Sequence, residues 1–305
     1  MTLETYIPHG PLQEFVDYIA FISGKESGTG VAFPRMNQVI IINLGTRFSS
    51  SDVYHPSSPR ETNSAIWING KQDDPFLLEN SGTTAMYAIG LKLGMIPYFA
   101  NLPALETNNI TLGAEHWTSH DVFFLREQLM ECTSVAEGFR RIEKYLLHQL
   151  KGRDFTELER VKWLGRAMYT QTVEEIGRHL GMTRKRLSSE ARHYFGGPIK
   201  NIQGIIRLNK TLSAIATSVT GQPAQTQPIA QTQPTAQPHS TAHTLSSLHE
   251  YFDQSHFIHD FKARTGITPL QYKRLVQQFP FIAWTPNFIA LPRETFLQFI
   301  SSQPR

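Results

Sequence analysis

The chain has 305 residues, of which 40% are hydrophobic, and a net charge of +3. This length and composition predict two folded domains and exclude a chain that is disordered throughout. No apolar run approaches the roughly 20 residues that a membrane span needs. The first ten residues lack the pattern of a secretion signal, and Cys132, as the single cysteine, excludes an internal disulfide. We therefore expect a cytoplasmic protein with no membrane partner.

The charge is distributed unevenly between the two halves of the chain. Residues 1–150 carry 10 Lys and Arg against 16 Asp and Glu, whereas residues 151–305 carry 19 Lys and Arg against 10 Asp and Glu. A basic half behind an acidic half indicates that one half meets a polyanion such as nucleic acid, although a basic solvated face has the same composition.

Residues 1–113 have the pattern of strands, and residues 120–150 have the pattern of a helix. The segment RMNQVIIINLG is a β-branched run closed by a glycine, and SAIWINGKQ and TTAMYAIGLKL are further strand candidates. Apolar residues then recur every three or four positions up to Leu150. We predict an α+β protein whose residues 1–150 form a strand-rich, barrel-like domain for sensing or oligomerisation. Candidate ligand-lining residues, with core packing as the alternative, are Trp67, Phe76, Tyr87 and Tyr98.

The C-terminal half contains a helix-turn-helix pattern over residues 172–196. Thr172 and Glu175 form a capping box, Gly181 suits a tight turn, and Thr183 can begin a second helix. The second helix of such a unit enters the major groove. Its expected outward, DNA-binding residues are Arg184, Lys185, Ser188, Ser189 and Arg192. A plain helical hairpin remains an alternative for this segment.

A second unit is predicted within residues 251–274, which read YFDQSHFIHDFKARTGITPLQYKR. This segment closely resembles the signature of AraC/XylS-type transcription regulators, in which two helix-turn-helix units are joined by a long helix. The segment TVEEIGRHLGMTRKRLSSEARHYFGG fits the first unit of that family. The N-terminal part of one of its subgroups is similar to the segments YIPHGPLQEFVDYIAFISG, VIIINLG and YAIGLKLGMIPYFANLPALE. The resemblance implies DNA-reading positions at Lys185, Ser188, Ser189, Gln254, Ser255 and His259. We add His256 and Lys262 to the expected DNA-binding residues of the second helix.

The chain departs from the family pattern in two places. Glu250 and Ser246 stand where a turn glycine and a buried alanine are usual. Residues 216–241 contain the repeat AQTQP and almost no large apolar side chain, which predicts a flexible linker or, alternatively, an exposed polyproline strut. Such a tether would leave the geometry of the two units no longer preset, so we expect weaker and more spacing-tolerant DNA binding.

Residues 154–275 are thus predicted to form a tandem DNA-binding domain interrupted by that linker, and residues 276–305 an extension that folds back on a domain without an assigned function. We expect no enzyme, cofactor or metal, since phosphate-loop, G-x-S-x-G and H-E-x-x-H patterns are absent and His116 and His120 lack a third ligand. The predicted function is a sequence-specific regulator, activator or repressor, bound to double-stranded promoter DNA. The alternative is a degenerate family member that acts through protein partners. A small-molecule effector, a homodimer and contact with RNA polymerase are left open.

Overall fold

The computed structural model describes residues 2–25, 28–36, 38–55, 61–118, 121–221 and 254–302, except for the side chains of Glu61, Thr62, Gln254 and Trp284. His120, Ser246, Glu250 and residues 222–241 of the predicted linker lie outside the described residues. In the described part, no helix is long and apolar enough to cross a membrane.

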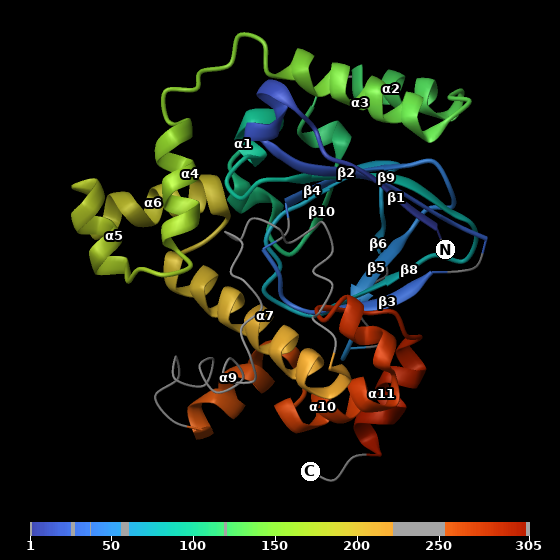
Figure 1. The fold of residues 1–305 in the computed structure, drawn as a ribbon, viewed down its shortest axis with the longest axis vertical. Helices are drawn as coiled ribbons and strands as arrows, with labels where there is room; N and C mark the ends of the chain where they lie inside the picture. Colours follow the sequence, from blue (N-terminus) through green and yellow to red (C-terminus); the bar gives the residue numbers. More distant parts are fainter. Residues whose placement is uncertain are drawn as a thin grey trace.

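The N-terminal strands form two antiparallel sheets (Figure 1). Sheet A has the strand order β1 (Thr2–Tyr6), β2 (Val16–Gly24), β9 (Thr84–Leu91), β4 (Gln38–Asn43), β7 (Ile66–Asn69) and β10 (Thr111–Gly113). Sheet B has the order β11 (Phe288–Ile289), β3 (Thr29–Ala32), β8 (Phe76–Glu79), β5 (Ser49–Asp52) and β6 (Glu61–Thr62). The predicted α+β class is confirmed, but the barrel-like closure is wrong, because no pairing among the described strands joins the edges of either sheet. Strand periodicity specifies which face is buried and carries no information on closure.

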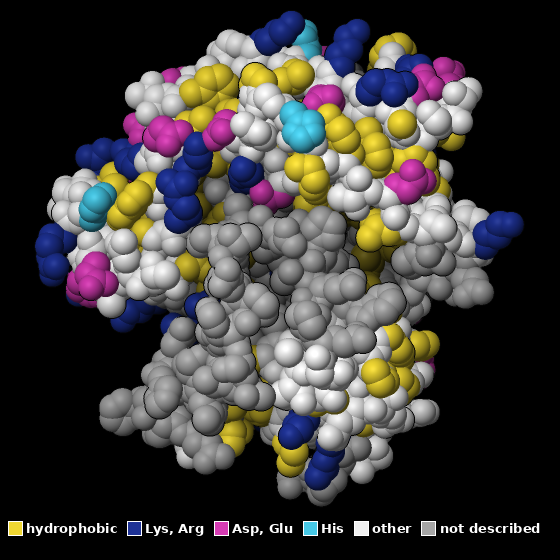
Figure 2. Space-filling model, in the orientation of Figure 1, with side chains coloured by type: hydrophobic (Ala, Val, Ile, Leu, Met, Phe, Trp, Pro, Cys, Tyr) yellow, Lys and Arg dark blue, Asp and Glu magenta, His cyan; other side chains and the backbone are white. Residues whose placement is uncertain are grey.

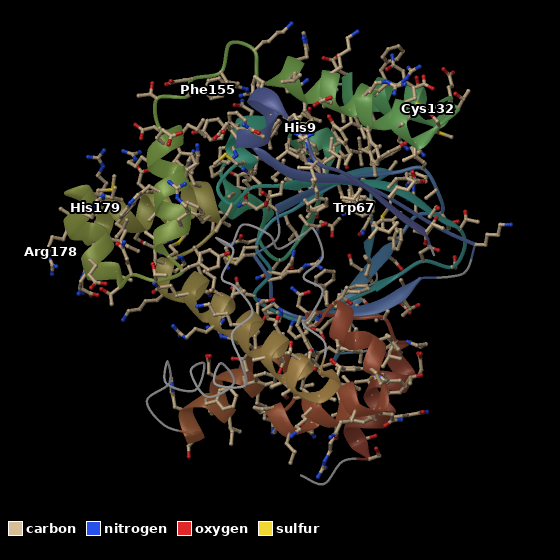
Figure 3. The ribbon with its side chains drawn as sticks, in the orientation of Figure 1. His9, Trp67, Cys132, Phe155, Arg178 and His179 are labelled. Atoms are coloured by element: carbon tan, nitrogen blue, oxygen red, sulfur yellow. The ribbon has the colours of Figure 1, made fainter. Side chains whose placement is uncertain are left out.

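The alternation of side chains along the strands of sheet A gives the sheet two buried faces. Ile40 and Ile42 of β4 pack in the larger core beneath α2 (Asp121–Met130) and α3 (Val135–Gln149). Ile41 between them belongs to a separate small cluster with Trp67, and Leu78 of sheet B packs against that cluster. In Figure 3 Trp67 lies in the space between the two sheets. The two sheets therefore face each other across this cluster, as successive residues of a strand point to opposite faces.

The C-terminal half is helical, apart from β11. Its elements are α4 (Leu158–Ala167), α5 (Val173–Leu180), α6 (Arg184–Phe195), α7 (Ile199–Thr220), α9 (Gln254–Thr265), α10 (Pro269–Gln278), η6 (Pro280–Trp284) and α11 (Arg293–Ser301). The N-terminal half also contains the short helices η1 (Gly10–Glu14), α1 (Ile96–Phe99), η2 (Ala104–Thr107) and η3 (Ala114–His116). Figure 1 shows α7 running from α4–α6 at one end to α10 and α11 at the other, with α9 alongside it.

The hydrophobic cores each combine N-terminal and C-terminal residues. The larger core joins one face of sheet A and helices α1–α3 to α4–α6 and the first part of α7. The second core joins sheet B to the later part of α7, to α9 and α10, and to residues 280–302. The C-terminal extension thus folds back, as predicted, and its partners are both the second unit and the N-terminal strands.

The predicted linker begins too early in the sequence. Helix α7 continues through residues 216–220 and ends at Gly221, whose φ of +67° gives a left-handed C-cap. Ala216 is fully buried beside Leu212 in the second core, so this segment gains burial that its small, polar composition did not indicate.

Candidate DNA-binding surface

The first helix-turn-helix unit forms as the sequence predicts. The Thr172 backbone N–H donates to Glu175 Oε2 at 2.7 Å, and the Glu175 backbone N–H donates to Thr172 Oγ1 at 3.3 Å. Gly181 has a φ of +62° and ends α5 in the left-handed conformation that glycine tolerates. Thr183 Oγ1 then accepts a hydrogen bond from the Arg186 backbone N–H at 3.3 Å and begins α6. The two helices are consequently joined by a turn of only three residues.

Helix α6 presents a polar and cationic face to solvent. Leu187, Ala191 and Phe195 are buried on its other side. The predicted contact residues on the exposed face are Arg184, Lys185, Ser189 and Arg192, whereas Ser188 is half-buried. Figure 2 shows Lys and Arg side chains gathered over this first unit. These residue types can bind phosphates and base edges.

Two acidic residues position the cations around this face. Arg184 Nη2 lies 2.7 Å from Glu174 Oε1 of α5, although the Arg184 side chain is 82% exposed. Glu190 of α6 lies on the inner side of the unit and pairs with Arg160 of α4, with 2.9 Å between Glu190 Oε2 and Arg160 Nη2. The first pair is solvent-exposed and adds little stability, whereas the second, less exposed pair links α6 to α4.

The C-terminal end of α6 is attached to the N-terminal domain. The buried Gln38 side chain of β4 donates from Nε2 to the Tyr194 carbonyl at 3.2 Å. Its Oε1 accepts from the backbone N–H groups of Gly94 and Met95 at 3.0 and 3.1 Å. Asn108, directly after η2, donates from Nδ2 to the Gly196 carbonyl. Sequence reasoning gave no sign of these bonds, because their partners are far apart in the chain.

Helix α9, like α6, exposes to solvent the face that the sequence predicts to bind DNA and buries the opposite face. Phe257, Phe261 and Thr265 are buried, and Gly266 ends the helix with a φ of +75°. The exposed predicted residues are Ser255, His256, His259 and Lys262, whereas the side chain of Gln254 is not described. Thr268 and Gln271 form a capping box that starts α10.

Ile258 is a surface residue that the sequence analysis missed. Aligning the buried pair Phe257 and Phe261 with Leu187 and Ala191 of α6 places Ile258 at the position of Ser188. Its side chain is 38% exposed among polar neighbours. The signal is present in the sequence as this internal correspondence between the two helices.

Helix α7 fixes the relation between the two units. Its 22 residues span roughly 33 Å at the rise of an α-helix, close to one turn of DNA at about 34 Å. Leu208 and Leu212 of α7 pack in one core with Phe257 and Phe261 of α9. The expectation that the insert leaves the geometry no longer preset is therefore wrong, because α9 and α10 are packed directly on α7.

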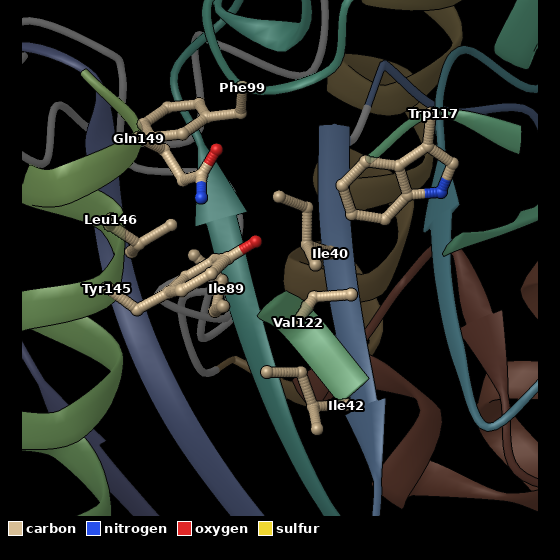
Figure 4. A pocket seen from close by; sticks show the side chains of 9 residues that line it. All are labelled: Ile40, Ile42, Ile89, Phe99, Trp117, Val122, Tyr145, Leu146 and Gln149. Atoms are coloured by element: carbon tan, nitrogen blue, oxygen red, sulfur yellow. The ribbon is translucent and has the colours of Figure 1, made fainter. Parts of the chain in front are cut away.

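The N-terminal domain contains one small apolar cavity among its described residues that lies against α2 and α3 (Figure 4). It measures about 10 Å³, the space of a single water molecule. Its lining residues are Ile40, Ile42, Ile89, Phe99, Trp117, Val122, Tyr145, Leu146 and Gln149. None of the four aromatic residues predicted to line a ligand site lies there: Trp67, Tyr87 and Tyr98 are buried core residues, and the Phe76 ring lies beneath Arg35.

Titratable groups in the described residues do not assemble a metal site. No group of three or more His, Cys, Asp or Glu side chains is found within that part of the chain. His116 lies 3.7 Å from the Glu115 carboxylate and is exposed, and its predicted companion His120 is outside the described residues. Burial shifts the pKa values of several tyrosines upward. It raises the pKa of Tyr87, for example, to about 12.

Comparison with known proteins gives structural similarities only. No protein-family model matches the chain, and no curated protein gives a significant match. The solved structures similar to it include ToxT from Vibrio cholerae, with a TM-score of 0.40 and 12% identity over 90% of this chain and 99% of that one. A second is unsaturated fatty acid-bound ToxT from Vibrio cholerae, with a TM-score of 0.40 and 12% identity over 84% and 94%. A third is the AraC-like transcriptional activator CuxR, with a TM-score of 0.24 and 13% identity over 70% and 87%.

Proposed function

We propose that this chain is an AraC-type transcription regulator that binds double-stranded promoter DNA through α6 and α9. The observation that carries the proposal is the pair of mainly polar stripes, one on each helix, with α6 directly preceding α7 and α9 packed on it. Two recognition helices held through one helix would enter successive major-groove segments on one side of a duplex.

Each stripe has the spacing of one helix face. On α6 the residues are Lys185, Ser188, Ser189 and Arg192, at positions i, i+3, i+4 and i+7. On α9 the corresponding residues are Ser255, Ile258, His259 and Lys262. Residues in the first turns would meet base edges, whereas Arg192 and Lys262 in the later turns suit phosphates.

The experiment starts from selection of bound duplexes out of a random pool with the full chain, followed by affinity measurements over a salt series. Specific binding should fall steeply with salt, because phosphate contacts release counterions. The Lys185→Ala and His259→Ala variants should each lose about 1–3 kcal/mol of discrimination at one base position. Lys144→Ala, which removes an exposed lysine from α3, is the matched control and should bind as the wild type does.

Flat and weak binding in the salt series would instead favour an interaction module that acts through protein partners. Equal footprints for the wild type and both recognition-helix variants would show that α6 and α9 are not the reading helices. Contact with RNA polymerase, homodimerisation and an effector at the N-terminal domain remain predictions from the sequence.

A further inference from the structure

Residues 280–302, here named the C-terminal strap, cross from the second unit to sheet B. Within the strap, Phe288 and Ile289 form β11, which pairs antiparallel with Ala32 and Val31 of β3. The Phe33 backbone N–H also donates to the Asn287 carbonyl at 2.9 Å. The strap thereby extends sheet B by one strand that comes from the opposite end of the chain (Figure 1).

Side chains fasten the strap to sheet B on both sides of this strand. The Phe288 ring lies directly over Gly30, where a Cβ atom would overlap it. Arg293 Nε and Nη2 both donate to the Val53 carbonyl, at 3.0 and 2.9 Å. A guanidinium that makes two bonds to one carbonyl is held in direction as well as in position.

The strap also contacts the second unit. The fully buried Tyr272 of α10 donates its hydroxyl to the Pro286 carbonyl at 2.8 Å. Phe296 of α11 is fully buried, with its ring 6.3 Å from Phe33 and 6.5 Å from Tyr54. Tyr54 itself donates to the carbonyl of Thr265, the last residue of α9. Sheet B, the strap and the second unit therefore share one continuous core.

The first helix-turn-helix unit is attached to a different part of the N-terminal domain from the second unit. Its contacts with the N-terminal domain run through Gln38 of sheet A and through Asn108 beside η2. Its apolar residues, including Leu187 and Phe195, belong to the core that contains the covered face of sheet A. The two recognition helices are thus attached to two different sheets, which meet across the small cluster around Trp67.

We propose that the N-terminal domain positions the two recognition helices separately, α6 from sheet A and α9 from sheet B, and that the strap, together with the direct contacts of Phe33 and Tyr54, couples sheet B to the second unit. A ligand or partner that loosens sheet B or the strap would then release the second unit while the first stays in place. The consequence for DNA rests on the proposed function, but the coupling itself can be measured without DNA.

The test is hydrogen–deuterium exchange on the full chain in the absence of DNA. A chain carrying both Phe288→Ala and Arg293→Ala loses the ring over Gly30 and both bonds to Val53. We expect exchange in residues 254–278 and 29–33 to become faster, on the order of tenfold or more, with residues 173–195 unchanged. Phe281→Ala is the matched control, since this strap residue is 46% exposed and removing its ring should change neither region.

A reciprocal variant completes the test. Asn108→Ala removes a side-chain bond to the end of α6, so exchange should rise in residues 190–197 and stay unchanged in residues 254–278. The proposal is overturned if the double strap variant leaves residues 254–278 as protected as in the wild type, because α7 and the direct contacts of Phe33 and Tyr54 would then hold the second unit without the strap. It is also overturned if residues 173–195 and 254–278 loosen together, because the chain would then behave as one cooperative body.

Discussion

Gly204 of α7 and Arg264 of α9 are in such close contact that a Cβ atom at position 204 would overlap the Arg264 guanidinium. The same guanidinium pairs with Asp260, at 3.1 Å from Arg264 Nε to Asp260 Oδ1. Glycine at this position of α7 leaves room for the Arg264 guanidinium, which would have to move for a larger residue, although a helix interior ordinarily disfavours glycine. The contact ties the second recognition helix to the helix that sets the spacing.

Enlarging residue 204 should displace the second unit and spare the first. Gly204→Leu inserts a side chain into a filled contact, and such overpacking typically costs about 1–3 kcal/mol. We expect footprints on a selected site to lose protection at the second half-site alone. Combining Gly204→Ala with Arg264→Ala removes the overlapping group and should bind better than Gly204→Ala by itself. Equal loss at both half-sites for Gly204→Leu would argue against a local effect.

Ile258 should contribute to the sequence preference of the second half-site. An exposed apolar side chain in a recognition stripe suits the C5-methyl group of thymine. Ile258→Ser should reduce the preference for one T·A pair, by about 1 kcal/mol on the scale of a buried methylene. Competition assays with duplexes that differ at single positions would measure this. Ala263→Ser, another exposed change on α9, is the control, and an equal loss of preference there would discount Ile258.

Lengthening the connection between α7 and α9 should change DNA binding little. The second unit is held by its packing on α7 and sheet B rather than by the length of the connection. An insertion of glycine and serine residues at position 232 should leave the dependence of affinity on half-site spacing as steep as in the wild type. A broader spacing profile after the insertion would restore the view that the connection governs the geometry.

The cap of α5 should stabilise the first unit in a pH-dependent way. Thr172→Ala removes a capping hydroxyl and should lower stability by about 0.5–2 kcal/mol, with Thr170→Ala as the exposed control. Hydrogen bonds from the Thr172 backbone and hydroxyl lower the pKa of Glu175. A lowered carboxyl pKa gives stability that is present above the unfolded-state pKa and lost as pH falls through the folded-state value. Thermal unfolding should therefore show the largest difference between wild type and Thr172→Ala near neutral pH, shrinking on acidification; a constant difference down to low pH would contradict the coupled cap.

Local signals in the sequence were sufficient for the helices of the first unit and for the outward face of α9. Thr172, Gly181 and Thr183 act on neighbouring backbone groups, so their roles can be inferred from a few adjacent residues. The pairing of Phe288 with Ala32 could not be inferred this way, because it joins opposite ends of the chain through a two-residue strand. Nor could the separation of the strands into two open sheets, which depends on which strands meet rather than on how each strand is patterned.

The mixed composition of the second core has a practical consequence for dissecting this protein. Val31, Phe33, Val53 and Leu77 cover apolar surface of α7, α9 and α10, and the strap covers more of it. A fragment cut at residues 154 and 275 would expose that surface to water, and large exposed apolar patches promote aggregation. Insolubility of such a fragment would report the loss of its covering residues and would say nothing about the affinity of the intact chain for DNA.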